Sequence, residues 1–157
     1  MKRVIERANQ IHAEFGTDLE QVADGLGLSV VYNDKLTGRM KEYYFGKTIV
    51  IQDALPVTEK RELVAHAIGH HLFHAGNHLA MQKRIYSFGN YHEKQANVFA
   101  ACLLMPLSEL SAFISNRSKT HEIAEYFQVR EELVRLRLMV WANFERELKS
   151  GAGARVG

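Results

Sequence analysis

The sequence has one cysteine and two prolines in 157 residues, and no apolar run as long as a membrane span. With Cys102 alone no intrachain disulfide can form, and its place in the apolar stretch FAACLLM predicts a buried, reduced thiol. A membrane-spanning helix needs about 20 consecutive apolar residues, so none is expected. The start, MKRVIERANQIH, lacks the apolar core of a signal peptide, and we therefore expect a cytoplasmic protein.

Neither sign of charge predominates in the sequence. The 20 Lys and Arg residues nearly balance the 18 Asp and Glu residues, which leaves a net charge of +2. So small an excess gives no general attraction to nucleic acids or membranes. The hydrophobic content of 46% suffices for a real core, and the length suits a single domain. We expect this domain to span residues 1–149, with 107–149 as a helical C-terminal subdomain and 150–157 as a disordered tail.

Apolar periodicity predicts helices on both sides of a small sheet. The expected helices are 4–15, 19–26, 58 towards 76, 92–105, 107–116, 120–127 and 130–149. The expected strands are 28–32, 39–45 and 48–52, with a hairpin turn between the last two. The predicted class is α+β with a small antiparallel sheet.

Histidines are concentrated in one expected helix, where the stretch AHAIGHHLFHAGNH holds five of the eight in the chain. His66 and His70 are four residues apart, so on a helix they share one face and can hold one metal ion. This is the spacing of the zinc-peptidase motif H-E-x-x-H, but Ala67 stands where the motif has glutamate. A lone pair of this kind is more often structural than metal-binding. His74 would lie on the same face as His66 and His70. It could be a fourth ligand, a supporting hydrogen-bond donor or a core histidine. His71 is expected to face solvent or to pack against neighbouring side chains.

A catalytic zinc site needs a third protein ligand. Glu93 is the only acidic residue between Ala75 and Ser108, and it heads an apolar helix that must pack on something. If that helix packs on the histidine helix, Glu93 completes a site. Taken alone, a glutamate at this place is more often a helix N-terminal residue favoured by the helix dipole. Asn97, one turn later, could orient a histidine ligand through a hydrogen bond.

Together, ELVAHAIGHHLFH and EKQANVFAACLLMP resemble the ImmA/IrrE family of metallopeptidases. The resemblance covers nearly the whole chain and implies a zincin-like fold with His66, His70 and Glu93 as metal ligands. It also implies zinc, with manganese as an alternative, and cleavage of a helix-turn-helix transcriptional repressor as the protein partner. The family often has a second acid just before the Ala-Asn pair, where this chain has Gln95.

The departure from the family pattern at Ala67 bears directly on catalysis. In the mechanism that the resemblance implies, the motif glutamate takes a proton from metal-bound water and passes it to the leaving amine. Alanine can do neither, and such a group contributes roughly 10²–10⁴ in rate, so we expect a retained metal site with little peptidase activity. Two origins stay open: an engineered truncation of a working peptidase, or a natural pseudopeptidase that sequesters a repressor.

The last two expected helices are similar to a helix-turn-helix, but their charges argue against DNA. Glu131 and Glu132 stand near the start of the second helix, where they would repel phosphate. A structural cap or a docking surface for the repressor is favoured over a DNA-binding regulator, which would depend on Arg135 and Arg137.

Substrate contacts are predicted at two further places. The strand before the histidine helix is the expected sheet edge on which a peptide would pair. Its residues are Thr48, Ile49, Val50, Ile51 and Gln52. Possible donors to the oxyanion of the transition state are Tyr86, Tyr91 and His92.

Overall fold

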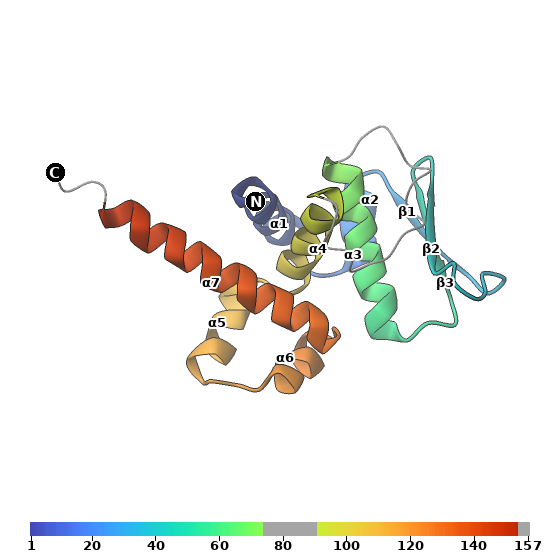
Figure 1. Ribbon diagram of the computed structural model, residues 1–157. Coiled ribbons are helices and arrows are strands. Elements are labelled where there is room, and N and C mark those ends of the chain that lie inside the picture. The colour runs from blue at the N-terminus through green and yellow to red at the C-terminus, as the bar shows by residue number, and fades with distance from the viewer. Residues whose placement is uncertain (74–90, 154–157) are drawn as a thin grey trace.

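The computed structural model describes residues 1–73 and 91–153 (Figure 1). Residues 74–90 and 154–157 lie outside this part, and with them the predicted site residues His74 and Tyr86. The elements in chain order are α1 (Lys2–Phe15), α2 (Leu19–Gly25), β1 (Ser29–Asn33), β2 (Glu42–Phe45), β3 (Thr48–Gln52), α3 (Val57–Phe73), α4 (Tyr91–Leu104), α5 (Leu107–Ser115), α6 (Thr120–Phe127) and α7 (Glu131–Gly153). The predicted α+β class is confirmed.

Local sequence signals explain most of the element boundaries. The side chain of Asp18 caps α2 by accepting hydrogen bonds from the backbone N–H groups of Glu20 and Gln21. Gly46 adopts φ 62° in the tight turn between β2 and β3, a conformation that favours glycine. Helix α3 begins at Val57 instead of after Thr58, because the carbonyl of Pro56 already accepts the first bond of the helix, from Lys60.

The sheet is mixed, and this corrects two predictions. Its strand order is β1-β3-β2, with β1 parallel and β2 antiparallel to β3, so the sheet is not purely antiparallel. Strand β3, residues 48–52, is therefore central and not the substrate-binding edge that we expected. The physical reason is burial: Ile49 and Ile51 are fully buried, and the most apolar strand takes the position where both neighbours cover it. Within residues 1–73 and 91–153 the edges of this sheet are β1 and β2.

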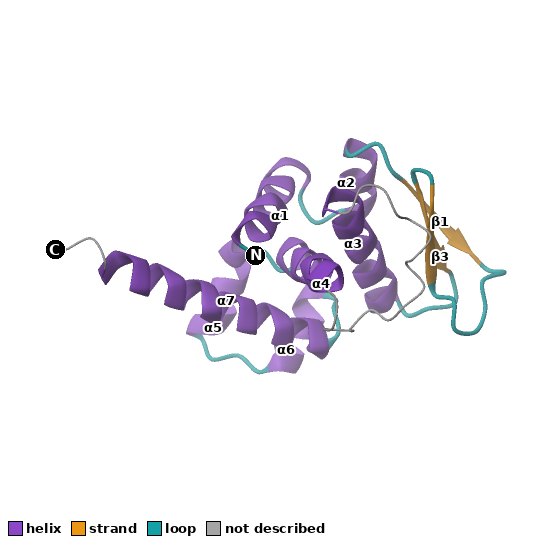
Figure 2. Ribbon diagram, turned by 45° about the horizontal axis from the view of Figure 1, so that its top comes forward, coloured by secondary structure: helices purple, strands orange, loops and turns teal. Residues whose placement is uncertain are grey.

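Helix α3 is the centre of the arrangement. Figures 1 and 2 show the sheet on one side of α3 and helices α1 and α4 to α7 towards its opposite side, whereas α2 contacts both α3 and β1. Helices α3 and α4 pack directly on each other, α1 covers α4, and β3 packs on α3. Helix α4 is buried from Ala96 to Leu104, and only its first residues, 91–95, are exposed or partly exposed.

The three C-terminal helices form the end of the molecule away from the sheet (Figure 1). In α7, Leu133, Leu136 and Val140 are buried and join this helix to the core. The helix continues to Gly153, so the predicted disordered tail is wrong for residues 150–153, where no proline interrupts helical hydrogen bonding. Among the described residues no single helix is long and apolar enough to cross a membrane, and only α4 and α5 together reach that length, as a pair bent by 78°.

Candidate metal centre

Helix α3 presents His66 and His70 on one face, as their spacing requires. Both are buried, with 4% and 7% of their surface exposed, respectively. Their ring centroids lie 4.6 Å apart and the rings are nearly perpendicular, at 82°. The two imidazoles therefore converge on one small volume in the interior.

The first turn of α4 brings the carboxylate of Glu93 into the same volume. Oε2 of Glu93 lies 3.2 Å from Nε2 of His66, and Oε1 lies 3.2 Å from Nε2 of His70. One donor atom from each of the three residues lies within 4.8 Å of the others. The structure thus brings together the three residues that the sequence predicts as ligands.

The donor set and its spacing fit a zinc ion. Zinc–nitrogen and zinc–oxygen bonds of about 2.0–2.1 Å in a tetrahedron place neighbouring ligand atoms about 3.3–3.4 Å apart. The two observed carboxylate-to-imidazole distances of 3.2 Å are close to that separation. Two histidines and one carboxylate leave one coordination position for water or substrate, which is the ligand count of a catalytic site.

The same contacts shift two pKa values in the protein without metal. Burial by itself lowers the pKa of His66, but the carboxylates of Glu42 and Glu93 outweigh it and raise that pKa to about 9. Burial by itself raises the pKa of Glu93, but His66 and His70 outweigh it and lower that pKa to about 2. At neutral pH His66 is therefore an imidazolium beside an ionised Glu93.

Glu42 is a residue of this centre that sequence reasoning missed. It lies on β2, its side chain is 10% exposed, and its Oε1 is 3.5 Å from Nδ1 of His66. On the same face of β2, the hydroxyl of Tyr44 is hydrogen-bonded to Nδ1 of His71 at 2.8 Å, so His71 joins the helix to the sheet. A lone acid in period-two register with a buried tyrosine is the signal that could have revealed Glu42.

Ala67 lies between the two ligand histidines along α3 and is buried, with 2% exposure. It packs within the apolar core that also contains Val64 and Ile68. A larger side chain at this position must be directed towards the ligands or displace core neighbours.

The structure does not test the roles predicted for Asn97, Tyr91 and His92. Asn97 is buried, and its amide nitrogen has no hydrogen-bond partner in the described part of the chain, so its orienting role stays a prediction. Tyr91 is 63% exposed, and its hydroxyl accepts a hydrogen bond from Gln95 at 3.4 Å. His92 is exposed on the same turn. Their role as oxyanion donors also stays a prediction.

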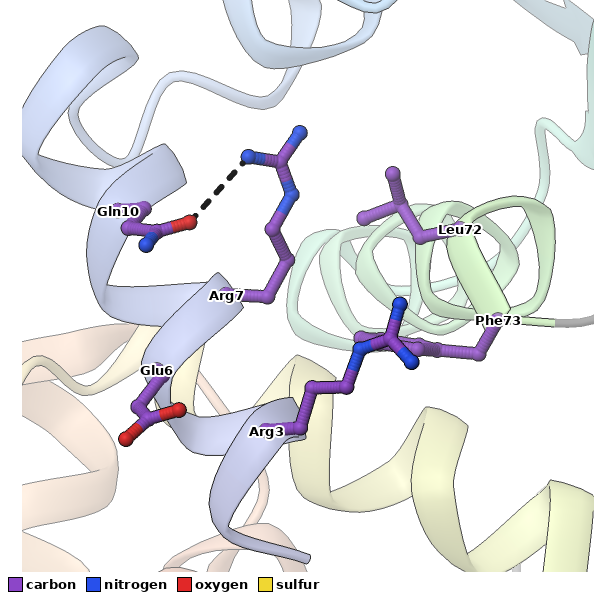
Figure 3. Close-up of a pocket in the computed structure, with 6 residues that line it drawn as sticks. All are labelled: Arg3, Glu6, Arg7, Gln10, Leu72 and Phe73. Atoms are coloured by element: carbon purple, nitrogen blue, oxygen red, sulfur yellow. Dashed lines mark hydrogen bonds between the residues drawn. The ribbon is translucent and has the colours of Figure 1, made fainter.

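A separate cavity of about 320 Å³ lies between α1 and the last turn of α3 (Figure 3). Arg3, Glu6, Arg7 and Gln10 line it from α1, and Leu72 and Phe73 line it from α3. Arg7 donates a hydrogen bond to Gln10 at 3.4 Å across its rim. None of these residues is a predicted ligand, so this cavity is distinct from the metal centre.

Comparisons with known proteins agree with this geometry. Residues 23–139 match the model of a peptidase family described as the IrrE N-terminal-like domain. The solved structure of a Mycobacterium tuberculosis transcriptional regulator matches with a TM-score of 0.63 at 21% identity, over 85% of this chain and 45% of that one. The present chain thus spans less than half of that protein, and the likeness shows the fold. No curated protein matches the chain.

Proposed function

Because this chain belongs to the peptidase family of the IrrE N-terminal-like domain, we propose that it is a zinc-binding member that recognises a helix-turn-helix repressor and is kept from cutting it by Ala67. The family is one of metallopeptidases. The observation that carries the proposal is the convergence of His66, His70 and Glu93, whose donor atoms lie within 4.8 Å of one another, with each imidazole Nε2 3.2 Å from an oxygen of Glu93. Manganese is the alternative ion, since imidazole and carboxylate oxygen also suit it.

A divalent ion held there supplies an electrophile that polarises a carbonyl and makes water more acidic. The chain's own residues hold that ion and exclude bulk water, because both histidines are buried. What the chain lacks is a proton acceptor at position 67. Glu93 is occupied as a ligand, and Glu42 lies against Nδ1 of His66, on the other side of the ring from Nε2. Neither acid replaces the missing glutamate.

The strand best placed for substrate is β2. It is an edge of the sheet, it runs antiparallel to β3, and it contacts the metal helix through Glu42 and Tyr44. An extended peptide could pair with its outer side through backbone hydrogen bonds. Phe45, which is 78% exposed at the end of β2, would then contact the peptide's side chains.

A DNA-binding function finds no support in the C-terminal helices. Arg137 is only 3% exposed, and its Nε donates a hydrogen bond to the carbonyl of Met105 at 2.9 Å. Arg135 is paired with Glu131 at 2.9 Å, so its charge is compensated within α7. We therefore propose a structural or repressor-docking role for α6 and α7. That the protein and its repressor meet in the cytoplasm stays a prediction.

Restoring the acid at position 67 tests the proposal. The zinc-loaded A67E variant should cut a repressor encoded next to this gene roughly 10²–10⁴ times faster than the present chain, because it regains a general base. A67Q is the matched control, since glutamine has the same size without the acid, and circular dichroism and zinc content would verify that each variant is folded and loaded.

The outcomes separate the two origins of Ala67. Binding by all forms with cleavage by A67E alone supports a peptidase whose base was removed. Binding by a folded, zinc-loaded A67E without cleavage identifies a natural pseudopeptidase. Absence of repressor binding by every folded form contradicts the proposed partner.

A further inference from the structure

Glu42 is a buried carboxylate whose hydrogen-bonding capacity is not used. Only 10% of its side chain is exposed, and its Oε2 has no hydrogen-bond partner in the described part of the chain. A buried charged group of this kind is costly unless another group compensates it. The group that can compensate the charge of Glu42 is the imidazole of His66, whose Nδ1 lies 3.5 Å from Oε1 of Glu42.

One ring nitrogen of His66 also lacks a hydrogen-bond partner in the described part of the chain. Its Nε2 faces Glu93 at 3.2 Å, whereas its Nδ1 is buried and makes no hydrogen bond within the described part. A neutral imidazole that gives the lone pair of Nε2 to a metal must carry its proton on Nδ1. That N–H needs an acceptor, and Glu42 is the carboxylate that faces it.

We propose that Glu42 is the positioning residue of the metal centre: it accepts the Nδ1–H of His66, fixes that tautomer and directs Nε2 at the ion. This inference rests on the proposed metal site. It also completes the charge balance, because Glu42 and Glu93 together carry two negative charges that match a divalent ion. Carboxylates that orient a histidine ligand in this way strengthen metal binding by 10- to 100-fold.

The register of β2 against β3 determines the direction of the Glu42 side chain. In the β2–β3 ladder Glu42 is opposite Ile51 and Tyr44 is opposite Ile49, so both side chains of β2 point to the face that packs on α3. The Tyr44–His71 hydrogen bond of 2.8 Å fixes the strand against the helix independently of the metal ligands. The sheet edge therefore carries one contact to a ligand histidine and one to a non-ligand histidine.

This pair of contacts supplies a matched experiment. Zinc dissociation constants would be measured by chelator competition for the full chain and for E42A, E42Q and Y44F. We expect E42A to bind zinc 10- to 100-fold more weakly. E42Q should lie between the two, because the amide keeps an acceptor oxygen but loses the charge. Y44F removes the hydrogen bond between Tyr44 of β2 and His71 of α3 and should leave zinc affinity unchanged.

A second readout distinguishes orientation of the ligand from general support of the fold. The visible absorption of Co²⁺ bound in place of zinc should change in E42A and not in Y44F, because only Glu42 acts on a ligand. Thermal unfolding without metal would show whether each variant is folded.

The inference is overturned if E42A and E42Q bind zinc as tightly as the unchanged chain, or if Y44F weakens binding as much as E42A. Failure of the unchanged chain to bind zinc would instead refute the proposed metal site itself. The two failures are thus distinguishable.

Discussion

At the scale of single residues, a proton and a metal ion compete for one atom of His66. In the metal-free protein the pKa of His66 is raised to about 9, since burial, which alone would lower it, is outweighed by Glu42 and Glu93. Its Nε2 therefore carries a proton at neutral pH and holds it towards Glu93. The pKa of Glu93 is lowered to about 2, so that residue stays ionised over the same range.

Zinc affinity should consequently rise with pH, by about tenfold per unit, and level off above a pH of about 9, where His66 has lost its proton. Chelator competition at several pH values would measure the slope. Calorimetry in buffers of different ionisation enthalpy should count about one proton released per zinc near neutral pH. An affinity that does not change over this range would contradict the raised pKa.

In the protein without metal, the stability of the folded state should depend on pH in the opposite direction to zinc affinity. A raised pKa stabilises the folded state fully below the ordinary histidine value of 6.5, and this gain is lost as the pH rises through about 9. Metal binding and metal-free stability therefore have opposite pH dependences, which one set of unfolding curves with and without zinc can display.

At the scale of elements, local sequence patterns predicted the bounds of helices and strands better than they predicted which elements pack or pair with each other. The bounds of β3 and α6 match the expected residues, because strand alternation and helical periodicity are properties of short segments. The strand order could not be read this way, since β1 pairs with β3 across an intervening strand. Glu42 was missed for the same reason: it belongs to no motif with His66, and only packing of β2 on α3 brings them together.

The approach of the three proposed ligands to one another was predictable for two different reasons. His66 and His70 follow from helical spacing alone. Glu93 required that α4 pack on α3, and the apolar face of α4 with the resemblance to a metallopeptidase family supplied that expectation. The contact depends on Gly69, where a Cβ would lie 3.0 Å from Cα of Ala96, 3.1 Å from Cδ1 of Phe99 and 3.2 Å from the carbonyl oxygen of Ala96.

The G69A variant should therefore be less stable, by about 1–3 kcal/mol, because backbone atoms of α4 cannot move aside without separating the helices. Separation would also draw Glu93 away from the histidines and weaken zinc binding. Urea unfolding and a zinc titration would measure both effects. In an open helix interior, glycine-to-alanine changes are instead stabilising by roughly 0.5–1 kcal/mol, so a stabilised G69A would rule out close packing at this point.

At the scale of the whole molecule, α3 connects three parts that are distant in sequence. Its middle carries His66 and His70, one side meets the sheet, and its first turns pair with Arg130, the residue before α7. The guanidinium of Arg130 donates to Oε2 of Glu62 at 2.6 and 2.9 Å, and its backbone N–H donates to Oε1 of the same residue. Glu59 extends the network, at 3.7 Å from Arg130 and 2.6 Å from Lys41, the residue before β2.

Removing the guanidinium should be costly, because Glu62 is only 1% exposed. The R130M variant should lose about 3–5 kcal/mol of unfolding free energy, as expected when one partner of a buried ion pair is removed. The double variant E62L/R130M should regain much of that loss, since it no longer buries a charge. Urea unfolding of the metal-free protein measures all three forms under one condition.

The control is in α7, which Arg130 directly precedes: Arg135 makes an exposed i,i+4 pair with Glu131 at 2.9 Å, and R135M should cost no more than about 1 kcal/mol. If R130M is no worse than R135M, the network adds nothing and apolar contacts alone hold the C-terminal helices. If R130M is severely destabilised and the double variant recovers, the cost comes from the unpaired charge of Glu62, and apolar packing, which includes that of α7 on α4, is enough to join the C-terminal helices to the rest of the protein.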